Sequence, residues 1–424
     1  VYINDKLAGH WAYGYNAFRV YAAPYLKKGK NEISVSLNNR EESSRWYPGG
    51  GLYRPVQLVM NADAATINPW GCYFRTESIN KGKAEVSICT NINNVDKTLS
   101  IENQLVDNAG KVVAQFKYGD FDAQGNVVKT LTVDDAQLWS PESPYLYKLV
   151  TRLYRNNKLI DQTRQNVGIR TVSVAQYDGF QLNGVSRKIK GVCLHHDLGP
   201  IGAAVNKAAL IRQIRTMKDM GCDAIRTAHN MPSTWQMEIC DSMGMMVMAE
   251  SFDMWIYPKC KNGYALNFKQ WADRDLENLV LNHRNHPSIV MWSIGNEIPE
   301  QWSEEGRNIS EHLQNICHKL DPTRPVTQGM DQAEAALKSG FAQVMDVPGF
   351  NYRVHKYDKN IRQLPKGFLL GSETASTVSS RGIYKFPVEP SDSKKYADGQ
   401  CSSYDVEYCP WSNLPDDDWQ MQDD

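Results

Sequence analysis

The sequence predicts a multidomain fold in which two all-β segments precede a parallel α/β barrel. Short strand-like runs separated by turn residues fill residues 1–172. From Arg187 onward, strand-like runs alternate with amphipathic helices, which is the pattern of a parallel sheet covered by helices. One apolar run, residues 289–294, stops abruptly at a Gly-Asn-Glu tripeptide. In parallel α/β barrels, strand tips of this kind carry the chemistry.

Length and composition set the bounds. The chain of 424 residues is too long for one hydrophobic core, so we expect two or three domains. Its 42% hydrophobic residues, 22% charged residues and formal net charge of −1 are typical of a globular protein. This charge balance gives no bulk attraction to nucleic acid or to a membrane surface, so neither is predicted as a partner. No apolar run reaches the ~18 residues that a membrane span needs.

The first residue is Val1, and strand-like sequence follows it with neither an initiator Met nor a signal peptide. We therefore expect the true N-terminus to be missing. The nine cysteines show no CxxC pair and no Cys/His metal spacing. We expect buried free thiols, predict neither a metal nor a cofactor, and leave the compartment open.

Residues 1–62 are predicted to be all-β, with strands at 1–3, 17–20 and 32–37. The stretch 44–54, SRWYPGGGLYR, has a different character. Its three consecutive glycines allow close backbone approach while aromatic residues crowd around them. We expect a tightly packed corner there.

Residues 63–172 are predicted to form a second set of strands, for example at 84–89 and 147–154. Several short strands at this spacing over about 100 residues indicate an immunoglobulin-like sandwich, although the Cys–Trp–Cys pattern of antibody domains is absent. The pair Asn183-Gly184 then predicts a hairpin turn before the pattern changes.

The remaining chain is predicted to be an α/β barrel that is one strand short of closure. A helix should begin after Asn206 as its N-cap and end before Gly221. Further helices are expected at 233–243, 267–282 and 309–320. The seven expected strands lie at 187–194, 222–226, 245–249, 289–294, 325–327, 344–347 and 368–370.

Two of these strands deliver a carboxylate to their ends. The central run leads to Glu297, and the last one leads to Glu373. Two such carboxylates are the minimum equipment for cleaving a glycosidic bond. An alternative is purely structural: Glu297 and Glu300 would lie in the first turn of a helix and complement its dipole.

Five motifs in this order, SRWYPGGGLYR, GVCLHHD, IRTAHN, NHPSIVMWSIGNE and GSETA, resemble glycoside hydrolase family 2. This is the family of β-galactosidases, β-glucuronidases and β-mannosidases. The resemblance implies a jelly roll of the sugar-binding type at 1–62, lacking its first strands. It also implies an immunoglobulin-like sandwich at 63–172 and a TIM barrel at 173–424 without its last strand. The Trp of the eighth strand that floors the family's sugar site is absent, so we expect a truncated segment of a larger enzyme.

The resemblance implies a role for four residues at the reacting bond. Glu297 matches the family's general acid/base and Glu373 matches its nucleophile. Asn296 matches the amide that hydrogen-bonds the sugar 2-hydroxyl, and Tyr352 matches the tyrosine that orients the nucleophile.

Five more residues are implied in the sugar pocket. Arg226 matches a positive charge near the nucleophile, while His229 and His195 match contacts to the terminal sugar. Asp253 and Trp255 follow the third strand and are expected to shape the pocket. Some β-galactosidases of the family hold Mg²⁺ beside the acid/base, but no such ligand set is matched here and no metal is predicted.

The predicted function is that of a retaining, exo-acting β-glycoside hydrolase with a carbohydrate substrate, and β-galactosidase is the first choice. A β-glucuronidase or a β-mannosidase of the same family is the first alternative. A non-catalytic carbohydrate-binding homologue is the alternative from another class, since fold alone does not prove function. The sequence leaves open the sugar, the linkage and whether the protein is a homo-oligomer.

Overall fold

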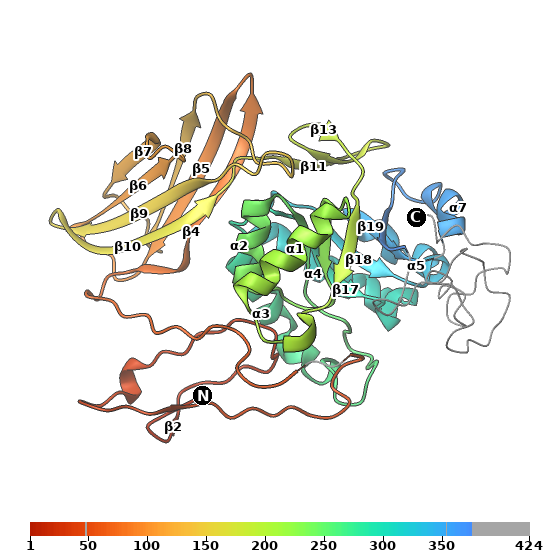
Figure 1. Cartoon of the computed structure of the whole chain (residues 1–424), viewed down its shortest axis with the longest axis horizontal. Helices are drawn as coiled ribbons and strands as arrows, with labels where there is room; N and C mark the ends of the chain where they lie inside the picture. The colour runs from red at the N-terminus through yellow and green to blue at the C-terminus, as the bar shows by residue number, and fades with distance from the viewer. Residues whose placement is uncertain (47–48, 353, 375–424) are drawn as a thin grey trace.

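The computed structural model describes residues 1–46, 49–352 and 354–374. In these ranges the chain forms an N-terminal segment, an antiparallel sandwich and a parallel sheet covered by helices (Figure 1). The sandwich and the N-terminal segment both lie beside the helices of the parallel sheet. None of the helices in the described ranges combines the length and the apolar character that a bilayer crossing demands.

The N-terminal segment contains little regular structure. Among its described residues, one sheet has the order β2-β1-β3 and one helical turn is a 3-10 helix. The elements are β1 (Tyr2–Ile3), β2 (Lys6–Leu7), η1 (Ala23–Tyr25) and β3 (Ile33–Ser34). The strand expected at 17–20 is therefore wrong, and the one at 32–37 is shorter than expected. A strand forms only where a neighbouring strand pairs its backbone groups. Later in this segment the side chains of Val56, Leu58 and Met60 are exposed. A jelly roll at 1–62 stays a prediction.

The sandwich expected after this segment is present. One sheet has the order β4-β5-β8 and the other β10-β9-β6-β7, with antiparallel pairing throughout. Buried and partly buried residues alternate along β6, as the two-residue period of a strand requires. The strands are β4 (Ile67–Asn80), β5 (Lys83–Ile92), β6 (Leu99–Val106), β7 (Val112–Tyr118), β8 (Asn126–Val133), β9 (Tyr147–Arg155) and β10 (Lys158–Val167).

A small meander follows, made of β11 (Val172–Ala175), β12 (Gly179–Leu182) and β13 (Val185–Ser186). Its second turn is the predicted hairpin, in which Asn183 and Gly184 have φ of 53° and 75°. Positive φ at both central residues is what a type I′ turn needs. Phe180 of this meander packs with Val290 and Phe368 of the parallel sheet.

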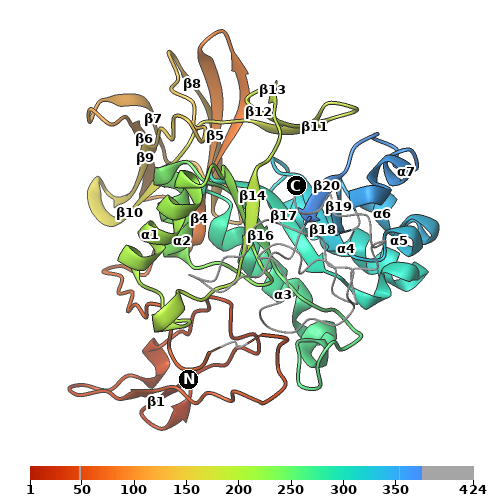
Figure 2. The same ribbon diagram turned by 45° about the vertical axis from the view of Figure 1, so that its right-hand side comes forward.

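Seven parallel strands form the predicted barrel sheet, in sequential order β14 to β20 (Figure 2). The strands are β14 (Gly191–Leu194), β15 (Ala224–Thr227), β16 (Met246–Glu250), β17 (Ile289–Asn296), β18 (Val326–Met330), β19 (Val347–Asn351) and β20 (Leu370–Glu373). The sixth strand differs from its predicted position at 344–347, because Val344 ends a helix and the strand begins at Val347. A short apolar run does not distinguish a buried helix end from a strand.

The expected helices are confirmed, and their caps explain their ends. Asn206 accepts the amide N–H of Ala209, Ser233 that of Gln236, and Ser303 that of Gly306. The helices are α1 (Lys207–Asp219), α2 (Thr234–Met243), α3 (Ala265–His283), α4 (Glu304–Leu320), α5 (Ala333–Ser339), α6 (Phe341–Val344) and α7 (Tyr357–Ile361). Short 3-10 turns lie at η2 (Gly199–Ile201), η3 (Pro299–Trp302) and η4 (Val354–Lys356).

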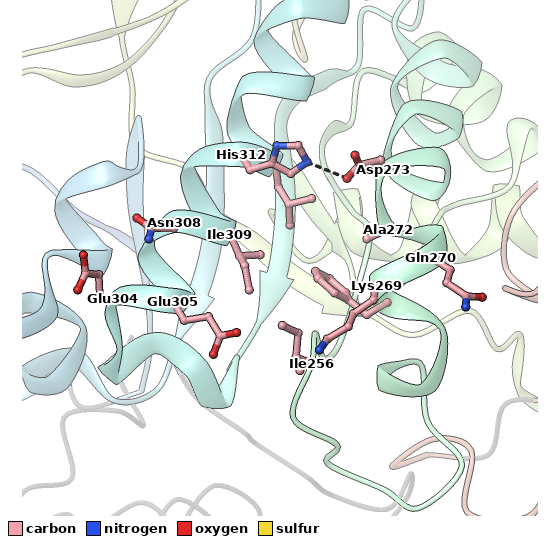
Figure 3. Close-up of a pocket in the computed structure, with 12 residues that line it drawn as sticks. Ile256, Lys269, Gln270, Ala272, Asp273, Glu304, Glu305, Asn308, Ile309 and His312 are labelled. Carbon is pink, nitrogen blue, oxygen red and sulfur yellow. Dashed lines mark hydrogen bonds and ion pairs between the residues drawn. The ribbon is translucent and has the colours of Figure 1, made fainter.

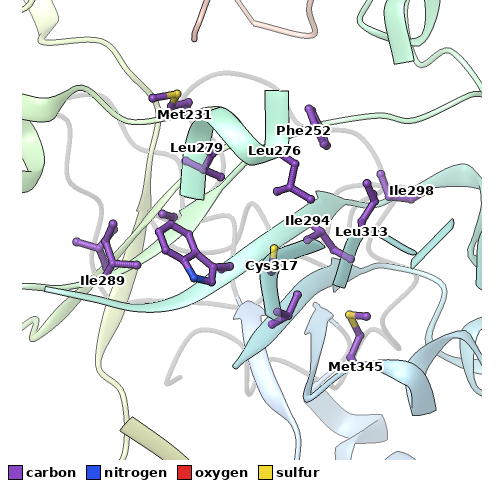
Figure 4. Packing of buried hydrophobic residues seen from close by; sticks show 14 of the residues in the cluster. Met231, Phe252, Leu276, Leu279, Ile289, Ile294, Ile298, Leu313, Cys317 and Met345 are labelled. Carbon is purple, nitrogen blue, oxygen red and sulfur yellow. The ribbon is translucent and has the colours of Figure 1, made fainter. Parts of the chain in front are cut away.

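Strand β17 is the centre of the hydrophobic core, and every one of its residues is buried. Ile289 and Ile294 on this strand pack among side chains of α3 and α4, such as Leu276 and Leu313 (Figure 4). Complete burial of one such side chain contributes roughly 1.5–3 kcal/mol. The core thereby fixes the strand whose tip carries Asn296.

The N-terminal segment is attached to the barrel through Asp275 on α3. Trp11 Nε1 and Asn16 Nδ2 donate to Asp275 Oδ1 at 2.7 Å and 2.9 Å, and the Tyr264 hydroxyl donates to the other oxygen. Burial raises the pKa of Asp275 to about 6, although the Tyr264 and Trp11 hydrogen bonds act in the opposite direction. We keep 1–62, 63–172 and 173–424 as a proposed division of the chain.

Candidate active site

Polar side chains converge at the carboxyl ends of the parallel strands. Arg226 lies on β15, and Glu250, Asn296, Asn351 and Glu373 are the last residues of four other strands. Since the carboxyl ends of parallel strands meet at one edge, these side chains come together although they are far apart in sequence. These side chains define the candidate site.

Glu373 is held as a carboxylate. Arg226 Nη1 donates to its Oε1 at 2.6 Å, and the Tyr352 hydroxyl donates to its Oε2 at 2.7 Å. His229 Nε2 lies 3.7 Å from Oε1. Burial alone would raise the pKa of Glu373, but Arg226, His229 and Tyr352 outweigh it and lower the pKa to about 2. The group is therefore ionised over the whole physiological range.

Arg226 is buried between two carboxylates. Its Nε donates to Glu250 Oε2 at 2.8 Å, and its Nη2 donates to Asn296 Oδ1 at 2.9 Å. Burial opposes its charge, but Glu250 and Glu373 overcome this effect and raise the pKa of Arg226. The guanidinium thus remains charged although it is almost fully buried.

Glu250 contacts both Arg226 and His229, two of the partners of Glu373. It has no exposed surface. Its Oε1 lies 2.6 Å from His229 Nδ1, and its Oε2 accepts the Ser293 hydroxyl at 2.6 Å as well as the Arg226 guanidinium. Glu250 therefore turns His229 so that Nε2 faces Glu373.

Two amides connect the strand tips. Asn351 Nδ2 donates to Asn296 Oδ1 and to Glu297 Oε1, both at 3.1 Å. This contact depends on Gly329, because a Cβ there would lie 2.8 Å from Asn351 Oδ1 and 3.0 Å from Arg226 Nη2. A glycine at the tip of β18 is what lets the amides and the guanidinium meet.

Glu297 has a different environment from Glu373. Its backbone adopts φ of 44° directly after β17, and its amide N–H donates to the Gly329 carbonyl at 2.7 Å. Its carboxylate contacts Asn351 and lies 3.4 Å from Arg45 Nη1. The structural alternative is met only in part. Glu300 lies in the first turn of the 3-10 helix η3 and accepts the amide N–H groups of Ile256 and Tyr257, whereas Glu297 precedes that turn.

The N-terminal segment reaches this site through Arg45. Arg45 Nη2 and Nε donate to the two oxygens of Asp253 at 2.6 Å and 3.0 Å. Asp253 also accepts from Lys259 Nζ at 3.2 Å and from Asn296 Nδ2 at 2.9 Å. Burial alone would raise the pKa of Asp253, but the Arg45 fork and Lys259 lower it. Burial lowers the pKa of Lys259.

Aromatic rings line one side of the site. The Trp46 ring lies 4.9 Å from the His195 ring and 5.5 Å from the His229 ring, centroid to centroid. Desolvation and the neighbouring histidines lower the pKa of His195 to about 4. Trp255 is different, because its side chain is fully buried in the core and donates to the Ile294 carbonyl at 3.0 Å. We therefore assign Trp255 to the support of the site and not to its surface.

The structure brings together most of the residues that the sequence singled out. Four others were missed: Arg45, Glu250, Lys259 and Asn351. Glu250 and Asn351 follow the same strand-end rule and could have been found with it. Arg45 lies in the motif that was interpreted only as a packed corner, and no signal in the sequence points to Lys259. The alanine of GSETA, residue 375, lies outside the described residues.

A pocket of about 820 Å³ lies elsewhere, between α3 and α4 (Figure 3). Phe268, Ile309 and Leu313 contribute apolar surface, and the Asp273–His312 ion pair of 2.9 Å lies across it. None of the converging polar residues lines this pocket. In the part of the chain that the structure describes, no group of three or more His, Cys, Asp or Glu side chains is arranged to hold a metal ion.

Two family models match the sequence. Residues 172–402 match "Glycosyl hydrolases family 2, TIM barrel domain", and residues 71–170 match "Glycosyl hydrolases family 2". Among solved structures, a family 2 member from Bacteroides cellulosilyticus is similar with a TM-score of 0.78 at 34% identity. That similarity covers 86% of this chain and 48% of the solved chain. A β-glycosidase from Bacteroides vulgatus also gives 0.78 at 34% identity, over 90% and 48% of the two chains.

Similar proteins carry an activity in their names, as two of them illustrate. A β-galactosidase from Bacteroides ovatus is 38% identical over 97% of this chain and 54% of its own length. A putative β-glucuronidase from Formosa agariphila is 36% identical over 91% of this chain and 36% of its own length. The chain thus spans about half of the first relative and less of the second.

Glu373 should make stability depend on pH under acidic conditions. Its pKa is about 2 in the folded chain against 4.5 for an ordinary glutamate. In the pH range between these two values the unfolded state therefore binds a proton that the folded state does not. The stabilisation is present above about pH 4.5 and is lost as the pH falls towards 2. In Glu373→Gln, the free energy of unfolding should fall less steeply than in the wild type between about pH 5 and 3.5.

Urea unfolding at a series of pH values measures this slope. Glu41→Gln, which removes an exposed carboxylate, is the matched control. Equal slopes for the wild type and Glu373→Gln would contradict the assignment of Glu373 as a carboxylate held ionised by Arg226.

Proposed function

Since the chain belongs to glycosyl hydrolase family 2, we propose that it is the catalytic part of a retaining, exo-acting β-glycosidase. Glu373 is the nucleophile and Glu297 is the general acid/base. The observation that carries this proposal is the unequal environment of the two carboxylates. Glu373 is locked to a buried guanidinium and a tyrosine hydroxyl, whereas Glu297 has one amide and one partly exposed arginine as partners.

In the first step, a Glu373 oxygen attacks the anomeric carbon and the bond to the leaving oxygen breaks. The proton of Glu297 passes to that oxygen, and a glycosyl ester forms on Glu373. In the second step, Glu297 removes a proton from water, and the water oxygen attacks the same carbon and displaces Glu373. Two inversions give overall retention of the β configuration.

The neighbours of Glu373 prepare it for this role. Arg226 keeps the attacking group ionised, and the Tyr352 hydroxyl fixes the direction of its second oxygen. Glu250 holds Arg226 and His229 in place. His195 and His229 present ring edges beside Trp46, which suits contacts with the terminal sugar.

Asn296 is proposed to bind the sugar 2-hydroxyl. One of its amide N–H groups goes to Asp253, and the second is available for the sugar. Its side chain has no exposed surface, so neighbouring side chains have to move for this contact to form.

Galactose is the proposed terminal sugar. The relative from Bacteroides ovatus is named a β-galactosidase. A glucuronide needs a cation for its carboxylate, yet Arg45, Arg226 and Lys259 each already contact a protein carboxylate. β-Glucuronidase is the second candidate because the relative from Formosa agariphila bears that name, and β-mannosidase is a third. A non-catalytic homologue is disfavoured by the intact set of contacts around Glu373.

The sugar is tested by assaying the complete protein on aryl β-galactoside, β-glucuronide and β-mannoside with the same aryl group. We expect kcat/KM for the galactoside to exceed both others by at least about tenfold, which corresponds to one well-made contact of ~1.4 kcal/mol. Equal or greater turnover of either competitor would overturn the choice of galactose.

Glu373→Gln keeps the shape of the side chain but removes the nucleophile. Turnover should fall by roughly 10⁴–10⁶-fold on every substrate, whatever the leaving group, as for other covalent nucleophiles. In the wild type, a 2-deoxy-2-fluoro glycoside should label the peptide that contains Glu373, as read by mass spectrometry. Glu305→Gln, on the surface of α4, is the control and should retain activity. A label on Glu250 or Glu297 would mean that the nucleophile is misassigned.

Glu297→Ala separates the two steps. Loss of proton donation, typically worth ~10²–10⁴-fold, should affect poor leaving groups most and largely spare the first step with an activated aryl group. The glycosyl ester should then accumulate, which gives a low kcat together with a low KM. Added azide needs no base, so it should restore turnover and yield a β-glycosyl azide. An α-azide product, or the same loss for all leaving groups, would refute an acid/base role for Glu297.

A further inference from the structure

Arg45 belongs to the N-terminal segment and reaches the strand tips of the barrel. Its Nε and Nη2 donate to the two oxygens of Asp253, which leaves Nη1 3.4 Å from Glu297 Oε2. A guanidinium presents a planar set of N–H groups that suits such a three-way contact. The Arg45 side chain is 37% exposed, whereas that of Asp253 is 5% exposed.

We propose that Arg45 is a positioning residue that holds the Glu297 carboxylate and favours its charged form in the second step of the reaction. The inference rests on the proposed function, because it concerns the acid/base of that reaction. The motif around Arg45, residues 44–54, predicts a packed corner and by itself indicates no catalytic role for Arg45.

In the described part of the chain, Glu297 has charged neighbours of both signs. Arg45 and Lys259 are the cations on its side of the site, and Asp253 is the anion between them. Glu373 is the second anion, and Arg226 and His229 face Glu373. Lys259 acts on Glu297 less directly, since its amine is engaged by Asp253 and by the Asn296 carbonyl.

The balance of these charges changes during the reaction. In the free enzyme Glu373 is an anion, and the first step requires a proton on Glu297. Once Glu373 is esterified, that anion is gone while the Arg45 cation remains. Arg45 then favours the charged form of Glu297, which is the base that the second step needs. A cation at this position therefore matters more for deglycosylation than for glycosylation.

The test uses Arg45→Gln in the complete protein, with Arg45→Lys as the variant that keeps the charge. Arg40→Gln, an exposed arginine of the same segment, is the control. We expect the alkaline limb of kcat/KM to move up by about one pH unit in Arg45→Gln, from the loss of one partly screened cation close to Glu297. With a dinitrophenyl glycoside, whose turnover is limited by deglycosylation, kcat at neutral pH should fall about tenfold. With a poor leaving group it should change less.

Arg45→Lys should leave the alkaline limb within about half a unit of the wild type, and Arg40→Gln should leave it unchanged. If Arg45→Gln does not fold, as judged from its thermal unfolding, Arg45→Lys decides alone, and a full-unit shift in it overturns the proposal. Equal losses on all substrates with an unmoved limb would make Arg45 a structural residue only. Failure of the proposed function is a separate outcome, seen as a wild type that inverts configuration or is not labelled at Glu373.

Discussion

The site depends on one buried cation, Arg226. A guanidinium removed from water is stable only when anions and acceptors surround it. Glu250 and Glu373 supply the charge, and Asn296 supplies a carbonyl oxygen. Because these partners come from three different strands, the pairing that stabilises Arg226 also sets the positions of the strand tips. Removing one partner would leave a buried charge uncompensated, so structure and chemistry use the same contacts.

The strand tips approach closely because a small residue leaves space there as well as because charged residues attract each other. Strand β17 is buried along its whole length and holds Asn296 rigidly at its end. Gly329 on the next strand leaves room for the Arg226 guanidinium and for Asn351, where any Cβ would collide. The hydrophobic core thus fixes the direction of the strand, and a missing side chain beside it creates the space for the polar network.

Much of this arrangement was predictable from sequence, because a barrel strand is an apolar run that stops at a polar residue. This pattern located Glu297, Asn296 and Glu373. Applied to the apolar run at 245–249, it would also have located Glu250, which follows that run directly. The sixth strand was misplaced, since a short apolar run fits a buried helix end equally well. Arg45 could not be identified as a site residue from sequence, for a different reason. Its partners Asp253 and Glu297 lie more than 200 positions away, and local periodicity carries no information about such pairs.

The proposed mechanism requires the two carboxylates to differ in protonation, and the cations beside them differ in burial. Arg226 is almost fully buried, touches Glu373 at 2.6 Å and is unscreened by water, so the charge on Glu373 is secure. Arg45 is partly exposed, stands 3.4 Å from Glu297 and shares its charge with Asp253, so its influence on Glu297 is weaker. A strong cation at the acid/base would have kept it ionised and prevented proton donation. In the proposed mechanism the weaker cation, Arg45, comes from a segment outside the barrel, while Arg226 on β15 contacts Glu373 directly.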